Sequence, residues 1–105
     1  MNACFIYMTA GTTEEAQAIG KALVEENLAA CVNIMDGMQS IYRWEGQVCE
    51  AQEVVLIAKT RSDQVGPLID RVKELHTYEC PCVLALPILE GNPAYLEWII
   101  NGGGS

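Results

Sequence analysis

Hydrophobic and polar positions change period along the chain, and the changes predict a domain that mixes strands and helices. Residues 3–9 form an apolar run of the length and composition of a buried strand. In the next stretch apolar positions recur every three or four residues, which predicts a helix over residues 13–27. Thr12 followed three residues later by Glu15 is the spacing of a capping box at the start of a helix.

The middle of the chain has the pattern of a long β-hairpin. Two β-rich runs, residues 28–35 and 38–44, are separated by Asp36-Gly37, and we predict a separate strand on each side of this break. The turn signal Glu45-Gly46 follows, and an acidic, edge-like stretch then leads into the apolar run of residues 54–58. We expect the segments on the two sides of the turn to pair with each other.

The second half of the chain predicts a helix, a strand and a final helix. Residues 65–75 carry the clearest amphipathic pattern, and Pro67 lies in the first turn, where its missing N–H costs little. Residues 82–89 return to a strand pattern. Asn92 followed by Pro93 is a favourable cap and first position for a C-terminal helix.

With the runs before the turn at Glu45-Gly46 counted as one arm of the hairpin, the predicted order is that of an α+β, ferredoxin-like fold: βαββαβ, an antiparallel sheet with helices on one face, plus a C-terminal helix. Length alone indicates a single domain. We assign residues 1–101 to it and residues 102–105 to a flexible Gly/Ser tail. Half of the residues are apolar, which is high for a small globular protein, and the excess favours an oligomer interface.

Charge and cysteine content narrow the expected partners and compartment. The net charge of −8 argues against nucleic acid and anionic membranes, which attract basic surfaces. For the same reason we favour packing at a subunit contact over base stacking for the triplet Tyr42-Arg43-Trp44. An odd count of five cysteines, with no signal-peptide pattern and no membrane-length apolar run, leads us to expect a reducing cytoplasm.

Candidate chemistry gathers in residues 76–82, His-Thr-Tyr-Glu-Cys-Pro-Cys, which contain the only histidine and two cysteines. Imidazole and thiolate together suit zinc and copper. Spacing alone leaves other roles open: Cys80 and Cys82 as small core residues, and His76 as a cap at the end of a helix. A nucleophilic pair of Cys82 with His76 lacks an identifiable orienting residue and oxyanion donor, so we predict that the protein is not an enzyme.

Several motifs in a fixed order add a family resemblance. They are residues 28–34 (LAACVNI), 40–46 (SIYRWEG), 59–60 (KT), 76–81 (HTYECP) and 86–88 (LPI), then Gly91 with residues 95–98 (YLEW). Together they resemble the CutA family of divalent-cation tolerance proteins, in register from about Phe5 to Trp98. The resemblance implies a ferredoxin-like homotrimer, similar to the PII nitrogen-signalling proteins, in which long hairpins pair between subunits. It also implies a cytoplasmic protein that binds divalent metal ions and is linked to copper tolerance.

The resemblance also points to metal ligands. The usual family motif is His-Pro-Tyr-Glu-x-Pro-Glu, and here Thr77 replaces the first proline and Cys82 the closing glutamate. A position that is cysteine in some members aligns with Met8. The implied ligands are therefore His76 and Cys82, with Met8 or Cys80 as helpers, a soft set that favours Cu(I) or Zn(II). The alternative function is a PII-like signalling or scaffolding trimer that binds a small metabolite or partner protein in its inter-subunit clefts.

Overall fold

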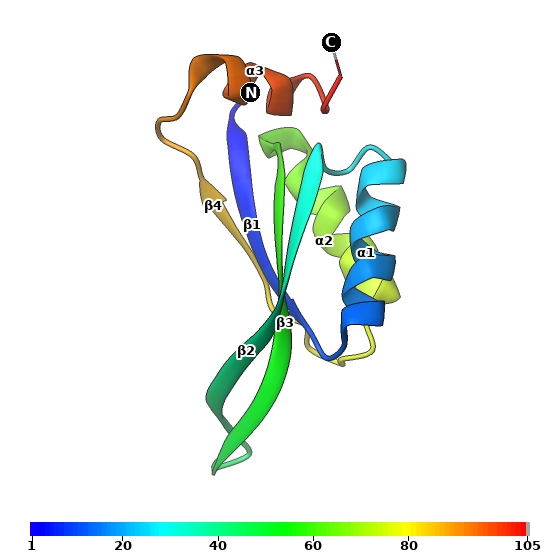
Figure 1. The fold of residues 1–105 in the computed structure, drawn as a ribbon, viewed down its shortest axis with the longest axis vertical. Helices are drawn as coiled ribbons and strands as arrows, with labels where there is room; N and C mark the ends of the chain where they lie inside the picture. Colours follow the sequence, from blue (N-terminus) through cyan, green and yellow to red (C-terminus); the bar gives the residue numbers. More distant parts are fainter. Residues whose placement is uncertain (105) are drawn as a thin grey trace.

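A four-stranded antiparallel sheet organises the chain (Figure 1). The structure is a computed structural model and describes residues 1–104. In chain order its elements are β1 (Ala3–Ala10), α1 (Thr13–Glu25), β2 (Cys31–Trp44), β3 (Gln47–Arg61), a 3-10 turn (Ser62–Gln64), α2 (Val65–Leu75), β4 (Val83–Pro87) and α3 (Pro93–Ile100). The strands lie in the order β2-β3-β1-β4. The predicted α+β class is confirmed.

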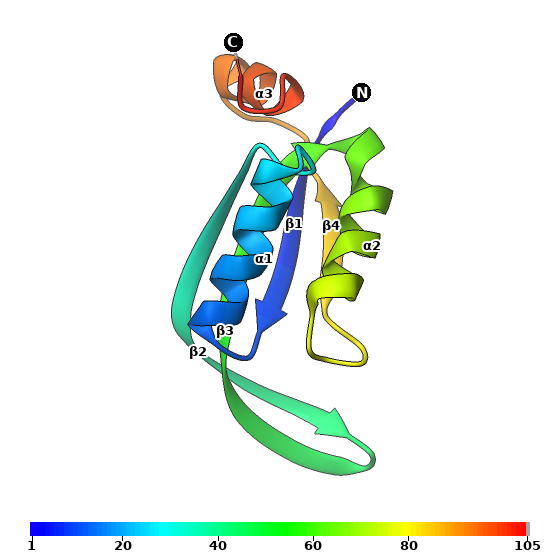
Figure 2. The same ribbon diagram turned by 90° about the vertical axis from the view of Figure 1, so that its right-hand side faces the viewer.

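The helices cover the sheet unevenly. Helices α1 and α2 lie side by side on one face, whereas α3 lies across the end of the sheet near the N-terminus (Figures 1 and 2). The core fills the space between the sheet and the first two helices. Its fully buried side chains include Ile6 and Met8 of β1, Ile19 and Leu23 of α1, and Leu68 of α2. None of the helices in residues 1–104 is long and apolar enough to cross a membrane.

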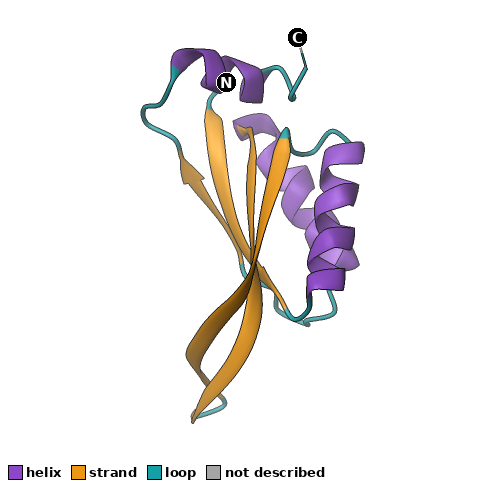
Figure 3. Cartoon of the chain, in the orientation of Figure 1, coloured by secondary structure: helices purple, strands orange, loops and turns teal. Residues whose placement is uncertain are grey.

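The predicted break at Asp36-Gly37 is wrong, because β2 runs through it. The pairing register shifts between Met35 and Met38, so that two residues of β2 lie opposite one residue of β3. Gly37 has a φ of +82°, a conformation in which glycine is not strained, and an extra residue is therefore absorbed as a bulge without ending the ladder. Residues 36–53, which we call the hairpin arm, extend past the helices as two strands and a turn (Figure 3).

Helix α1 ends two residues earlier than predicted, at Glu25, because Asn27 turns the chain out of the helix. Asn27 has a φ of 60°. The N–H of Leu28 donates to the carbonyl of Leu23 (2.8 Å), and the N–H of Asn27 donates to that of Val24 (3.1 Å). This pair of bonds is the Schellman motif, in which a left-handed residue closes the last turn.

The C-terminal glycines close α3 in the same way. Gly102 has a φ of +73°, and the N–H of Gly103 donates to the carbonyl of Trp98 (2.9 Å). The first part of the segment predicted as a flexible tail is thus hydrogen-bonded to the helix. Ser105, the last residue of that predicted tail, lies outside the described residues. The predicted bounds of α2 are confirmed, and β4 is shorter than predicted at both ends.

Candidate functional site

His76 lies at the end of α2 with a side chain that is only 1% exposed. Its Nε2 is 2.8 Å from the backbone oxygen of Thr9, and its Nδ1 accepts the N–H of Tyr78 (3.0 Å). A carbonyl only accepts and a backbone N–H only donates, so these partners require a neutral ring with the proton on Nε2. The ring nitrogen lone pair that could bind a metal therefore already accepts a hydrogen bond.

Glu15 of α1 ties the segment after His76 to the start of the helix. Its carboxylate accepts the N–H of Thr77 (2.8 Å) and the N–H of Gly11 (3.2 Å). Burial raises the pKa of Glu15, but the hydrogen bonds from Thr77 and Gly11 outweigh this effect and hold the pKa below its usual range. Only half of the predicted capping box forms: Thr12 Oγ accepts the N–H of Glu15, whereas the carboxylate of Glu15 reaches other partners.

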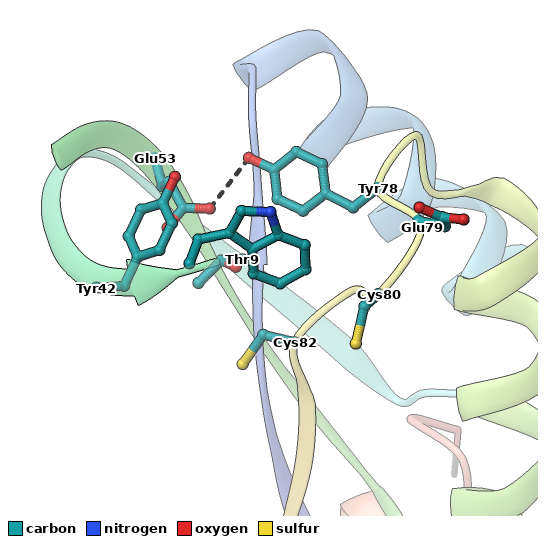
Figure 4. A pocket seen from close by; sticks show the side chains of 8 residues that line it. Thr9, Tyr42, Glu53, Tyr78, Glu79, Cys80 and Cys82 are labelled. Atoms are coloured by element: carbon teal, nitrogen blue, oxygen red, sulfur yellow. Dashed lines mark hydrogen bonds between the residues drawn. The ribbon is translucent and has the colours of Figure 1, made fainter. Parts of the chain in front are cut away.

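A hollow of about 400 Å³ opens where this segment meets the base of the hairpin arm (Figure 4). The hydroxyl of Tyr78 donates to Glu53 of β3 (3.1 Å), which links the segment to the arm. Burial, and then this hydrogen bond, raise the pKa of Tyr78 to about 12. The residues that line the hollow are Thr9, Tyr42, Trp44, Glu53, Tyr78, Glu79, Cys80 and Cys82.

Both cysteines of the segment face the hollow. Cys80 is exposed and Cys82 is half-buried, and the two side chains point to the same side in Figure 4. Burial, and then the negative charge of Glu53, raise the pKa of the Cys82 thiol. Two thiols and the side chains of Glu53 and Glu79 thus line one open space.

The four predicted ligands are not all brought together. Cys80 and Cys82 share the hollow, whereas Met8 is buried in the core with Ile6, on the helix-covered face of the sheet. His76 is not among the residues that line the hollow, and its Nδ1 lone pair accepts the N–H of Tyr78. Within residues 1–104 no group of three or more His, Cys, Asp or Glu side chains is arranged to hold a metal ion.

Sequence reasoning missed two contributors to this region. Glu53 comes from the arm and enters through the register of β2 and β3, in which it lies opposite Met38. Glu15 was recognised only as part of a helix cap. The spacing of Glu15 from Thr12 was the sole local signal for it, and no local signal singles out Glu53 among the acidic residues of its strand.

The face of the sheet without helices is rich in apolar side chains. Tyr7 of β1 lies opposite Leu84 of β4 and Ile57 of β3, and Phe5 lies opposite Leu86. Directly opposed residues share a face, and this one is opposite to the core residues of β1. Leu84 is 58% exposed and Leu86 48%. We call these five residues the open sheet face.

The family follows from comparison with known proteins. The model of the family "CutA1 divalent ion tolerance protein" matches residues 4–102. The chain belongs to this family. The divalent-cation tolerance protein CutA of Thermus thermophilus is 50% identical over 99 residues, which cover 94% of this chain and 96% of that protein. This relationship supports a role in metal tolerance.

Solved structures of family members share the fold. The CutA1 structure from Thermus thermophilus superposes with a TM-score of 0.93 at 49% identity, covering 97% of this chain and 99% of that one. The Archaeoglobus fulgidus structure, described as a periplasmic divalent cation tolerance protein CutA, has a TM-score of 0.91 at 44% identity, covering 95% and 97%. A relative from Arabidopsis thaliana, 44% identical over 91% of this chain and 53% of its own length, is named chloroplastic. The names of family members therefore place them in different cellular compartments.

Proposed function

We propose that this chain is a non-enzymatic protein of metal-ion tolerance that binds a copper- or zinc-type ion as a cytoplasmic homotrimer. The observation that carries this proposal is the pair of thiols, Cys80 and Cys82, at one hollow beside the carboxylate of Glu53. Thiolates select soft and borderline metals such as Cu(I) and Zn(II) over hard cations. Five free cysteines support a reducing compartment, and fractionation of the native cells tests that location.

In this proposal the two thiols are the primary ligands and the other predicted donors have supporting roles. Because residues 1–104 supply no complete group of three donors, the remaining ligands come from water or from a neighbouring subunit. His76 holds the segment in place through Thr9 and Tyr78. Met8 contributes to the core under it.

The open sheet face supports the trimer. Contiguous exposed apolar surface of this kind marks an association site. The hairpin arm carries further exposed apolar side chains, with Ile41 72% and Val48 65% exposed. A two-stranded ribbon is marginally stable by itself, so an arm of this length favours pairing with another subunit. This agrees with the PII-like assembly of ferredoxin-like units that the family resemblance implies.

The test is a metal titration with matched variants. Zn²⁺ and Cu⁺ are titrated into the parent, into Cys82→Ser, and into Cys80→Ser with Cys82→Ser, while Cys49→Ser on the arm serves as the control. We expect the double variant to lose about tenfold or more in affinity and the control to match the parent. The affinity of the parent should fall as the pH is lowered, because thiols must lose protons to bind.

Two results would contradict the proposal. If the double serine variant binds both metals as tightly as the parent, the two thiols are not metal ligands. If light scattering gives the mass of one chain rather than of three, the proposed trimer is refuted.

The aromatic lining of the hollow favours a second candidate, a PII-like trimer that binds a small metabolite there. Tyr42, Trp44 and Tyr78 supply apolar and stacking surface, with Glu53 as a polar anchor. A thermal-shift screen of metabolites supports this candidate if one of them stabilises the protein and metals do not.

A further inference from the structure

Cys80 and Cys82 flank Pro81 at the hollow, and we propose that they are a reversible dithiol–disulfide pair whose oxidation switches off metal binding. The redox pair stands on the geometry of the segment alone. Its effect on metal binding rests on the function proposed above.

The backbone brings the two thiols within reach of each other. The Cα atoms of residues two apart in sequence are separated by at most about 7 Å. The Cα atoms of disulfide-bonded cysteines lie about 4.4–6.8 Å apart. Residues 77–80 form bends, and the pairing of β4 with β1 begins only at Val83, so both cysteines precede the regular ladder. Their side chains line one hollow and point to one side (Figure 4). Chain connectivity therefore keeps the two Cα atoms within, or close to, the range that a disulfide spans.

The two cysteines have different surroundings, which assigns their roles. Cys80 is exposed, so a dissolved reagent reaches its sulfur first. Cys82 is half-buried, so its sulfur is less open to a dissolved reagent than that of Cys80. Cys80 is the attacking residue and Cys82 is the resolving residue.

The oxidant is a low-molecular-weight disulfide such as glutathione disulfide. The Cys80 thiolate attacks one sulfur of this reagent, which forms a mixed disulfide and releases one thiolate that takes up a proton. Cys82 then gives its proton to water and attacks the Cys80 sulfur, which displaces the second small thiol. The protein loses two protons and two electrons in total, and the small disulfide takes them up to become two thiols.

Oxidation of the pair would remove the metal ligands. The thiolate is the form of cysteine that binds metals, and neither sulfur remains a thiolate in the disulfide. Disulfides that are strained or exposed have the more oxidising potentials and are the labile, regulatory ones. A bridge across three residues at an exposed position belongs to this class, so excess thiol should reverse it.

The chain offers a clean readout for this chemistry. No Lys or Arg follows Lys73, so trypsin releases residues 74–105 as one peptide whose only cysteines are Cys80 and Cys82. The folded protein is equilibrated in graded mixtures of reduced and oxidised glutathione. The reaction is quenched by alkylation, the protein is digested, and the mass of the peptide is measured by mass spectrometry. The parent peptide should lose two hydrogens, escape alkylation and return to the dithiol with excess thiol. Cys82→Ser should keep a glutathione adduct on Cys80, and Cys49→Ser should behave as the parent.

Other outcomes overturn separate parts of the proposal. A glutathione adduct that persists on the parent peptide, or crosslinks to other cysteines, refutes the redox pair. If the disulfide forms but the zinc affinity of the oxidised parent falls by less than about tenfold, the switch is refuted and the redox pair stands. If the reduced parent does not bind zinc, the proposed function fails, while the mass of the peptide still decides the redox chemistry.

Discussion

Glu15 should stabilise the fold through its two backbone hydrogen bonds, and Glu15→Gln tests this. Hydrogen bonds to a charged group contribute about 1.5–3 kcal/mol each. The bond from Thr77 is short at 2.8 Å, the bond from Gly11 is longer at 3.2 Å, and the side chain is 13% exposed. Glutamine keeps one acceptor but turns an NH₂ group toward the second donor. One bond is lost and the other loses its charge, so we expect a loss of about 2 kcal/mol in the free energy of unfolding at neutral pH.

The stabilising effect of Glu15 should depend on pH, in the direction set by the shift of its pKa. Because the pKa of Glu15 is lowered in the folded state, its contribution is fully present above the pKa of glutamate in the unfolded chain. It is lost as the pH falls through the lowered folded pKa. The difference between parent and Glu15→Gln should therefore be constant near neutrality and shrink in acid.

Urea unfolding at one fixed protein concentration, over a pH series, measures this difference. Glu14→Gln is the control, because Glu14 is an exposed neighbour on the same helical turn. The reasoning is refuted if the two variants lose equal stability, or if the difference for Glu15→Gln persists unchanged in strong acid.

Three further predictions concern other parts of the chain. Asn27→Ala should lower the free energy of unfolding in urea by about 1 kcal/mol, because the φ of 60° at this position is strained for alanine. Asn27→Gly should stay within about 0.5 kcal/mol of the parent. Equal losses in the two variants would show that the backbone conformation is not the cause. Tyr78→Phe should remove a tyrosine that ionises near a pKa of about 12 from the ultraviolet titration. Loss of a tyrosine that ionises at the ordinary pKa instead would contradict the bond to Glu53. Leu84→Lys should lower the oligomeric mass measured by light scattering. Leu89 lies beyond the end of β4 and is 88% exposed, and Leu89→Lys should leave the mass unchanged. Equal dissociation by both variants would exclude the open sheet face as the subunit contact.

Sequence periodicity predicted those elements whose pattern depends only on their own residues. Helix α2 is an example, because its apolar positions repeat at helical spacing throughout and its bounds were correct. The break at Asp36-Gly37 failed for a non-local reason. The same dipeptide is compatible with a turn or a bulge, and only the pairing of β2 with β3, which has one residue fewer there, decides between them.

The candidate site shows the same limit. The cluster of His76 with two cysteines was visible because its members are adjacent in sequence. Strand alternation already separates Met8 from Thr9, but which face carries the hollow depends on where α1 and α2 pack. The protonation state of His76 also depends on distant atoms, since its Nε2 partner is the carbonyl of Thr9.

The structure separates the groups that hold the 76–82 segment from those that would bind a metal. The hydrogen bonds that fix the segment run through backbone groups: the carbonyl of Thr9 and the N–H groups of Thr77 and Tyr78. Position 82 takes no part in those bonds, so the glutamate expected from the family motif can become Cys82 while the segment keeps its path. What changes is the donor, from a hard oxygen to a soft sulfur. A carboxylate has no thiol to oxidise, so the same exchange is also what would make the site sensitive to redox conditions.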